Sequence, residues 1–383
     1  MGNCYLLVID GLGVGAQEDA ADYGDHNANT LGHVCAQTGC RLPNLGRLGL
    51  GNILELPSVP SSPNPLCAWG RMRETSPGKD STTGHWELAG VRLERPFPTY
   101  PEGFPEEVIE SFCRVTGQSG VLCNRPRSGT EVIADYGEEH LQDGRPIVYT
   151  SADSVFQVAA HTHAVPLEEL YRWCRLAREE VLTGEHGVGR VIARPFEGEP
   201  GSFERLSHAR RDYSLDPPEP NLLSLLQEAG IKRYSIGKVS DLFGEHYFTQ
   251  YRKTRGNAEG LSQLLSLMSA AEDSFVFVNL IDTDQQYGHR LDPEGYAACL
   301  QELDRAVPAI FSKLKEGDLL IVTGDHGNDP TSESTDHSRE FVPLLVFPGP
   351  PADLGTRETF ADVACSVAEF FGLEHSFPGH SFY

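Results

Sequence analysis

The sequence lacks the features of a membrane protein, a secreted disulfide-rich protein and a protein that works outside a reducing compartment. It contains no run of about 18 apolar residues, so no membrane-spanning helix is expected. Residues 1–9 lack the basic start and the long apolar core of a signal peptide. The nine cysteines are scattered without C-x-x-C spacing, which indicates free thiols in a cytoplasmic protein.

Positive charge is also scarce. The chain has 31 Lys and Arg residues against 55 Asp and Glu residues, which gives a formal net charge of −24. Such a protein is not expected to bind nucleic acid, whose phosphates favour basic surfaces. The same negative field would repel a phosphorylated small molecule, so local cations must overcome it. Bound metal ions would meet that need.

Apolar segments alternate between strand-like and helical patterns, which predicts an α/β fold. The near-continuous apolar character of the strands is typical of a buried, mainly parallel sheet flanked by helices. Strands are expected at residues 5–9, 233–239, 274–282, 318–326 and 341–347, and helices at 221–230, 260–271, 296–315 and 361–373.

Residues 97–217 have a different composition, with more aromatic residues, more prolines and shorter strands. One amphipathic helix is expected at 166–182. Proline-rich stretches at 95–105 and 216–220 flank this region and are typical of linkers. The sequence therefore predicts an inserted α+β domain at 97–217, within a core formed by 1–96 and 218–383.

The chain opens with an apolar strand and a glycine-rich turn, CYLLVIDGLGVGA. The spacing Gly11-x-Gly13-x-x-Ala16 fits a dinucleotide-binding turn, but no amphipathic helix follows directly, and residues 33–48 suggest only a short helix and a loop. Asp10, by contrast, ends a buried strand, and such ends face the binding crevice of open α/β sheets. The alternative for Asp10 is a turn-forming aspartate.

Two further strand ends and a nearby loop carry the same types of side chain: Asp282, Asp284, His289, Asp325, His326 and His337. Carboxylates with imidazoles suit a divalent ion such as Mn²⁺ or Zn²⁺. With Asp10 counted and Asp282 left aside, there are six such ligands, which are too many for one tetrahedral site. They suit two ions about 3.5–4 Å apart, which clamp the attacking and leaving oxygens of phosphoryl transfer. The alternative for Asp282 is a helix cap or a contact to a ligand.

The segment SPGKDSTTGHWELAG, residues 76–90, carries three consecutive hydroxyls, Ser81, Thr82 and Thr83, at the start of a predicted short helix. Backbone N–H groups and the helix dipole favour a phosphate there, and a metal ion can activate a coordinated hydroxyl. The alternative is an inert Ser/Thr-rich helix cap. His161 and His163 form an H-x-H pair without a third partner, and we do not assign them to a metal.

Several motifs resemble those of the phosphopentomutase family, within the alkaline phosphatase superfamily. They are VIDG at the start, GKDSTTGHWE, YTSADSVFQ, VGRVIARPFEGEPGSF, NLIDTDQQYGHR and TGDHGNDPT with TDHSRE. They occur in the family's order and span nearly the whole chain. The GKDSTTGHWE and paired metal motifs are specific, whereas the VIDG start is shared across the superfamily.

The resemblance implies a phosphatase-like core with two Mn²⁺ ions, a cap domain, and interconversion of ribose or 2-deoxyribose 1-phosphate with the 5-phosphate. It implies that a phosphorylated enzyme acts through a pentose 1,5-bisphosphate, and that glucose 1,6-bisphosphate or ribose 1,5-bisphosphate acts as activator. One ion would be held by Asp10, Asp325 and His326 with the nucleophile, and the other by Asp284, His289 and His337. The nucleophile aligns with Ser81. Many members have Thr there, so Ser is a departure that keeps the hydroxyl, and Thr82 and Thr83 stay as alternatives.

Further side chains are candidates for binding the phosphosugar: Asp153, Ser154, Arg194, Arg210 and Lys238. Guanidinium groups match phosphate, which favours Arg194 and Arg210, although a solvated surface charge is the alternative for each. Asp153 and Ser154 are candidates for the sugar hydroxyls. Lys238 follows a core strand and could face the same cleft. The sequence does not predict an oligomeric state.

Three other functions fit parts of this pattern. A cofactor-independent phosphoglycerate mutase has a similar core, but its N-S-E-V-G-H nucleophile motif is absent here. A phosphomonoesterase would transfer the phosphoryl group to water. A metal-dependent binding protein with a decayed site is the non-enzyme alternative, and the six intact ligands argue against it.

Overall fold

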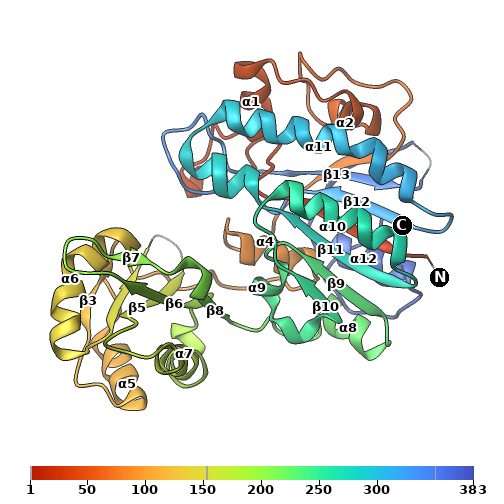
Figure 1. Cartoon of the computed structure of the whole chain (residues 1–383). Helices are drawn as coiled ribbons and strands as arrows, with labels where there is room; N and C mark the ends of the chain where they lie inside the picture. The colour runs from red at the N-terminus through yellow and green to blue at the C-terminus, as the bar shows by residue number, and fades with distance from the viewer. Residues whose placement is uncertain (1, 152–153, 350) are drawn as a thin grey trace. The chain divides into compact units, whose positions relative to one another are not determined.

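The computed structural model describes residues 2–151, 154–349 and 351–383, and it divides into two compact units (Figure 1). The larger unit contains Met1–Arg95 and Pro217–Tyr383, and the smaller unit contains Pro96–Asp216. The smaller unit is thus one continuous stretch of chain between two parts of the larger one. Its role as a cap over a substrate stays a prediction.

The larger unit is built on an eight-stranded sheet in the order β10-β9-β11-β1-β12-β13-β2-β14. All of its strands run parallel to their neighbours except β13, which is antiparallel to both β12 and β2. The strands are β1 (Cys4–Ile9), β2 (Ala68–Met72), β9 (Lys232–Ile236), β10 (Gln250–Arg252), β11 (Ser274–Leu280), β12 (Leu319–Thr323), β13 (Val342–Phe347) and β14 (Asp353–Arg357). This mainly parallel sheet confirms the predicted α/β class.

Helices cover both faces of this sheet (Figure 1). One group, α1 (Thr30–Thr38), α2 (Pro43–Leu48), α10 (Asn257–Ala270) and α11 (Pro293–Lys313), packs together, with α3 (Leu50–Ile53) beside α2. The other group consists of α4 (Ser81–Leu88), α8 (Leu222–Glu228), α9 (Val239–Phe243) and α12 (Asp362–Phe370). The four helices expected after residue 220 are all present, as α8, α10, α11 and α12.

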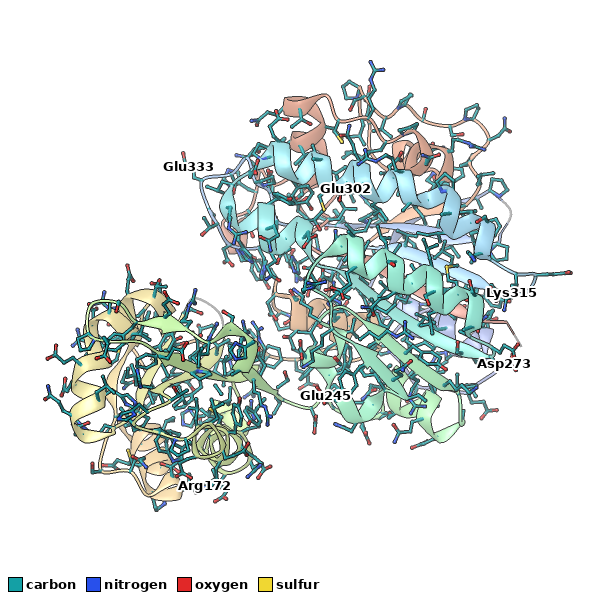
Figure 2. All side chains as sticks on the ribbon, in the orientation of Figure 1. Arg172, Glu245, Asp273, Glu302, Lys315 and Glu333 are labelled. Carbon is teal, nitrogen blue, oxygen red and sulfur yellow. The ribbon has the colours of Figure 1, made fainter. Side chains whose placement is uncertain are left out.

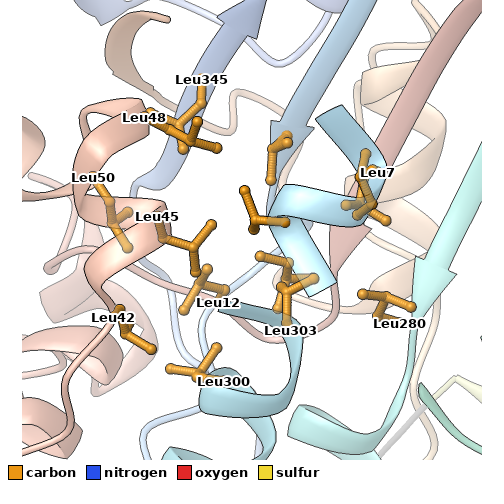
Figure 3. Close-up of a cluster of buried hydrophobic side chains, with 14 of the residues drawn as sticks. Leu7, Leu12, Leu42, Leu45, Leu48, Leu50, Leu280, Leu300, Leu303 and Leu345 are labelled. Atoms are coloured by element: carbon orange, nitrogen blue, oxygen red, sulfur yellow. The ribbon is translucent and has the colours of Figure 1, made fainter. Parts of the chain in front are cut away.

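Alternate residues of the central strands point to opposite faces of the sheet, as the two-residue period of a strand requires. On β11, Val276 and Val278 join the core beneath α10 and α11, whereas Phe277 contacts His85 of α4 and Phe243 of α9. The first core is dominated by leucines from strands and helices far apart in the sequence (Figure 3). Burial of both faces explains why these strands are apolar at nearly every position.

The smaller unit has its own sheet in the order β3-β4-β5-β6-β7, with β8 also paired to β6. The strands are β3 (Leu122–Pro126), β4 (Ile147–Thr150), β5 (Val155–His161), β6 (Arg190–Glu197), β7 (Glu204–Arg205) and β8 (Arg211–Ser214). The expected amphipathic helix is α7 (Leu167–Leu176), which continues as a π-helical turn at Ala177–Val181. The sequence pattern did not predict the other two helices, α5 (Glu106–Thr116) and α6 (Gly129–Asp143).

Charged side chains lie at the periphery of both units, among them Glu333 and Lys315, which project into solvent (Figure 2). Within the described ranges, no helix combines the length and the apolar character that crossing a bilayer requires.

Candidate metal centre and nucleophile

Three neighbouring strands of the larger sheet end in acidic residues. β1 is followed by Asp10, β11 by Asp284 after a short turn, and β12 by Asp325. β1 pairs in parallel with both β11 and β12, so their carboxyl ends meet at one edge of the sheet. The three residues are at most 3% exposed. Three buried carboxylates so close together require compensating cations.

The structure brings all six predicted ligands together. The ligand atoms of Asp10, Asp325 and His326 lie within 4.8 Å of one another, and so do those of Asp284, His326 and His337. His326 is therefore common to both groups. His289 joins the second group, because its Nε2 lies 3.3 Å from Oδ2 of Asp284 and its ring centre lies 4.8 Å from that of His337.

Asp282, the other acid after β11, has a different role. Its Oδ2 accepts a hydrogen bond of 2.7 Å from the backbone N–H of Asn257, the first residue of α10. Its own N–H donates to the side chain of Asn257. Asp282 therefore binds the N-terminus of α10 from another part of the chain, and it makes no side-chain cap bond to the helical turn that follows it.

Backbone carbonyls orient two of the imidazoles toward the acids. Nδ1 of His326 donates to the carbonyl of Gly327 at 3.0 Å, and Nδ1 of His289 donates to the carbonyl of Thr335 at 2.6 Å. Each Nε2 therefore faces the carboxylates. This is the usual way in which a protein fixes the tautomer of a metal-binding histidine.

The charges of the site reinforce one another. Burial lowers the pKa of His326, but Asp325 and Asp10 outweigh it and raise that pKa to about 10. Burial also lowers the pKa of His289, but Asp284 outweighs it and raises that pKa to about 9. Burial opposes ionisation of Asp284 as well, yet His337 and His289 hold its pKa well below the usual range. Carboxylates that stabilise imidazolium would stabilise a divalent cation in place of the protons.

The donor set fits divalent cations. Oδ1 of Asp10, Oδ2 of Asp325 and Nε2 of His337 are buried, and within the described part of the chain their nearest charged contacts, at 3.0–3.4 Å, lack the geometry of a hydrogen bond. Buried polar atoms of this kind normally have partners. Carboxylate and imidazole ligands together suit Mn²⁺ or Zn²⁺.

Ser81 is the first residue of α4 and lies against this cluster. Its Oγ is 3.0 Å from Nε2 of His326 and 2.8 Å from Nζ of Lys238. Thr83 instead donates its hydroxyl to the Asp80 carboxylate, which also accepts the N–H groups of Thr82 and Thr83 as the N-cap of α4. These N–H groups therefore bind a side chain rather than a phosphate, and only Ser81 of the three hydroxyls contacts a predicted ligand.

Lys238 follows β9 and reaches the same cluster. Its Nζ lies 2.7 Å from Oδ2 of Asp10, in addition to its contact with Ser81. Burial lowers the pKa of Lys238, but Asp10, Asp284 and Asp325 outweigh it, so the net pKa is raised and the group is cationic. The structure therefore places Lys238 at the hydroxyl and the metal ligands.

His85 is a contact that the sequence pattern did not predict. It is fully buried in α4, and its Nδ1 donates to the carbonyl of Ser81 at 2.9 Å and lies 3.0 Å from Oδ2 of Asp325. Its ring stacks on Phe277 of β11. His85 thereby links the backbone of Ser81 to the predicted ligand Asp325. The i, i+4 spacing from Ser81 on a helix was the available signal.

The remaining candidates belong to the smaller unit. Arg194 on β6 donates to the side chain of Gln157, and Arg210 forms two bonds of 2.6 Å with Asp212. Burial lowers the pKa of Arg194, and the nearby charge of Arg210 lowers it further. Ser154 donates its hydroxyl to the carbonyl of Pro98 at 2.5 Å. Asp153 lies outside the described residues.

A family model described as the metalloenzyme superfamily matches residues 2–375, so the chain belongs to this class of metal-dependent enzymes. Curated relatives narrow the assignment. The phosphopentomutase of Caldanaerobacter subterraneus subsp. tengcongensis is 52% identical over 98% of this chain and 96% of the relative. The phosphopentomutase of Deinococcus radiodurans is 52% identical over 99% of this chain and 98% of the relative. The chain therefore belongs to the phosphopentomutase family of isomerases.

A solved structure of a protein from Pyrococcus horikoshii matches 99% of both chains with a TM-score of 0.50 and 16% identity. At this identity the match shows a shared fold alone.

Proposed function

We propose that this protein interconverts the 1-phosphate and 5-phosphate of ribose or 2-deoxyribose through a phosphorylated Ser81. The position of the Ser81 hydroxyl, 3.0 Å from the histidine shared by both ligand groups, carries the proposal. The proposed reaction requires a hydroxyl next to a cluster that binds two cations, and the hydroxyl of Ser81 has that position.

Asp10, Asp325 and His326 would hold one Mn²⁺ ion together with Ser81, and Asp284, His289 and His337 would hold the other. Such ions neutralise charge on a transferred phosphoryl group and lower the pKa of a coordinated hydroxyl. The protein contributes the preorganised positions of these ligands, which in phosphoryl transfer accounts for most of the catalysis.

The reaction begins with the phosphate on Ser81. The free hydroxyl of a pentose phosphate forms a bond to phosphorus as the bond from phosphorus to Ser81 Oγ breaks, which gives the pentose 1,5-bisphosphate. Lys238 lies 2.8 Å from Oγ and stabilises the charge that develops there. After the bisphosphate turns around, Ser81 Oγ takes the other phosphate, and the isomeric monophosphate is released.

Sugar and distal phosphate would be bound by residues of the smaller unit. The charge of Arg210 lowers the pKa of Arg194 beyond the effect of burial, and a bound phosphate would compensate both guanidinium charges. Ser154 and Asp153 are proposed for the sugar hydroxyls. Glucose 1,6-bisphosphate or ribose 1,5-bisphosphate would phosphorylate an enzyme that has lost its phosphate.

A cytoplasmic location is part of the same proposal, because all nine cysteines are free thiols. A partition assay tests the function: ribose 5-phosphate should yield ribose 1-phosphate with little inorganic phosphate. Release of inorganic phosphate as the main product would instead identify a phosphomonoesterase.

A further inference from the structure

Glu340 is an acidic side chain to which neither the sequence pattern nor the proposed reaction assigns a role. It is 1% exposed and lies beneath the metal-binding loops. Its Oε2 accepts backbone N–H groups from Gly15 at 3.0 Å and Thr30 at 2.9 Å. Its Oε1 accepts the hydroxyls of Thr30 at 2.6 Å and Ser338 at 2.7 Å.

Two glycines leave room for this carboxylate. A Cβ on Gly13 would lie 2.2 Å from Oε2, and a Cβ on Gly327 would lie 2.4 Å from Oε1. The glycine-rich turn after β1 therefore packs against a carboxylate of the protein itself and gives it one backbone N–H, that of Gly15. A dinucleotide-binding turn likewise directs backbone N–H groups at an anion.

Each metal-binding segment touches Glu340 or a residue bound to it. Gly13 and Gly15 follow Asp10 in the turn, Gly327 follows His326, and Ser338 follows His337. The fourth connection runs through Thr30. The Thr30 hydroxyl accepts the N–H of Asn328 at 3.1 Å, and the amide of Asn328 donates to Asp284 at 2.7 Å.

We propose that Glu340 is a positioning residue that sets the spacing of the loops carrying both groups of metal ligands. The proposal rests on the proposed two-ion site, and it concerns geometry rather than charge. Side chains that bind metal ions lose affinity when the residues that orient them are removed, typically 10–100-fold. Glu340 orients loops of both groups at once.

Glutamine is the informative replacement. The partners of Oε1 are hydroxyls, which can accept a hydrogen bond as well as donate one. In Glu340→Gln, the amide NH₂ would take the position of Oε1 and donate to the two hydroxyls. The amide oxygen would take the position of Oε2 and accept the two N–H groups, so all four contacts would be kept. Glu340→Gln should therefore preserve the spacing, whereas Glu340→Ala leaves two N–H groups and two hydroxyls without their acceptor.

The test measures Mn²⁺ binding by titration calorimetry and the spin coupling of the bound pair by electron paramagnetic resonance, with no substrate present. We expect Glu340→Ala to bind Mn²⁺ at least about tenfold more weakly and to lose the coupled signal. Glu340→Gln should retain both. Unchanged affinity and coupling in Glu340→Ala would overturn the proposal, and so would an equal loss in Glu340→Gln, which would assign the effect to charge.

Asp304→Ala is the matched control, because Asp304 is a buried carboxylate that accepts the N–H groups of Asn44 and Leu45 away from the metal site. It should lower the melting temperature and leave Mn²⁺ binding unchanged. If Glu340→Ala does not fold, Thr30→Val tests the proposal instead, because it removes the hydroxyl between Glu340 and Asn328. Thr30→Val should weaken Mn²⁺ binding, and unchanged binding would overturn the proposal. A wild-type protein that binds no pair of ions would contradict the proposed function instead.

Discussion

Gly84 of α4 lies directly against the backbone of Asp325. A Cβ at position 84 would approach the carbonyl oxygen of Asp325 to 2.0 Å, a distance that no side chain tolerates. The helix that carries Ser81 can therefore reach the end of β12, where the predicted ligands Asp325 and His326 lie, only because residue 84 is glycine.

Gly84→Ala should consequently displace α4 and lengthen the distance from Ser81 Oγ to His326. A misplacement of about 1 Å can lower a rate on the order of 10²-fold, and we expect a loss of kcat of that size. Steady-state kinetics with ribose 5-phosphate measure it. Gly260→Ala in α10 is the control, because its Cβ first meets a flexible leucine side chain at 3.3 Å, and its kcat should stay near wild type. A fully active Gly84→Ala enzyme would contradict the packing argument.

Ser81→Ala should abolish mutase activity, with a loss on the order of 10⁴-fold or more, because no hydroxyl remains to carry the phosphate. Ser81→Thr should retain activity, since it keeps the hydroxyl. Peptide mapping by mass spectrometry should find one phosphate on the peptide containing Ser81. Thr82→Val is the matched variant and should stay active. Phosphate on Thr82 or Thr83 would move the nucleophile to that residue.

Asp325→Ala should reduce the bound metal, because a methyl group cannot replace a carboxylate ligand. Metal analysis after dialysis measures the content per chain, and the stabilisation that Mn²⁺ gives in a thermal melt should shrink in parallel. Asp282→Ala serves as control, since Asp282 binds the first N–H of α10 and lies two residues before the predicted ligand Asp284. Its metal content should equal that of the wild type. Equal metal content in Asp325→Ala would remove Asp325 from the ligand set.

Arg210→Ala should lower kcat/KM for the phosphopentose about 10–100-fold, the effect of losing hydrogen bonds to a charged group. Metal content should not change. Arg172→Ala in α7 removes an arginine of the same unit that pairs with Glu169, and its kcat/KM should stay unchanged. Wild-type kinetics in Arg210→Ala would exclude Arg210 from phosphate binding.

We expect His140 of α6 to make the smaller unit less stable in acid. Its Nδ1 donates to the carbonyl of Arg145, and its Nε2 accepts the N–H of His161, so the buried ring must be neutral. Burial lowers its pKa below 6.5. Below that pH the unfolded chain binds the proton and the folded chain does not, so stability falls with decreasing pH by at most about 1.4 kcal/mol per unit.

Hydrogen exchange read by mass spectrometry tests this at the peptide containing His161. Its amide should lose protection between pH 7 and pH 5.5, after correction for the intrinsic rate. His140→Gln has no group that titrates there, and its protection should change less over the same range. An equal change in both proteins would show that His140 is not responsible.

The local pattern of the chain was sufficient for five strands of the larger sheet, β1, β9, β11, β12 and β13, and for the helices α8, α10, α11 and α12. It did not predict the strands β2, β10 and β14. Continuous apolar runs such as residues 274–280 predicted buried strands, and the acids that follow them predicted a common site, because parallel strands end at the same edge. The pattern failed for α6, which begins with Gly129 and contains Gly137. Packing explains that helix, since Gly137 lies where a Cβ would come within 2.5 Å of Phe203.

The sequence by itself determined which chemical groups the protein has and at which strand ends they stand, because these depend on residue type and on a period of two or 3.6 residues. Only the tertiary structure decided which groups meet. Ser81 and His326 are 245 residues apart, and Glu340 and Thr30 are 310 residues apart. The turn after β1 has the glycine spacing of a nucleotide-binding turn, but the carboxylate of Glu340, far along the chain, lies against it. Contacts of this kind depend on how the folded elements pack, which no local pattern contains.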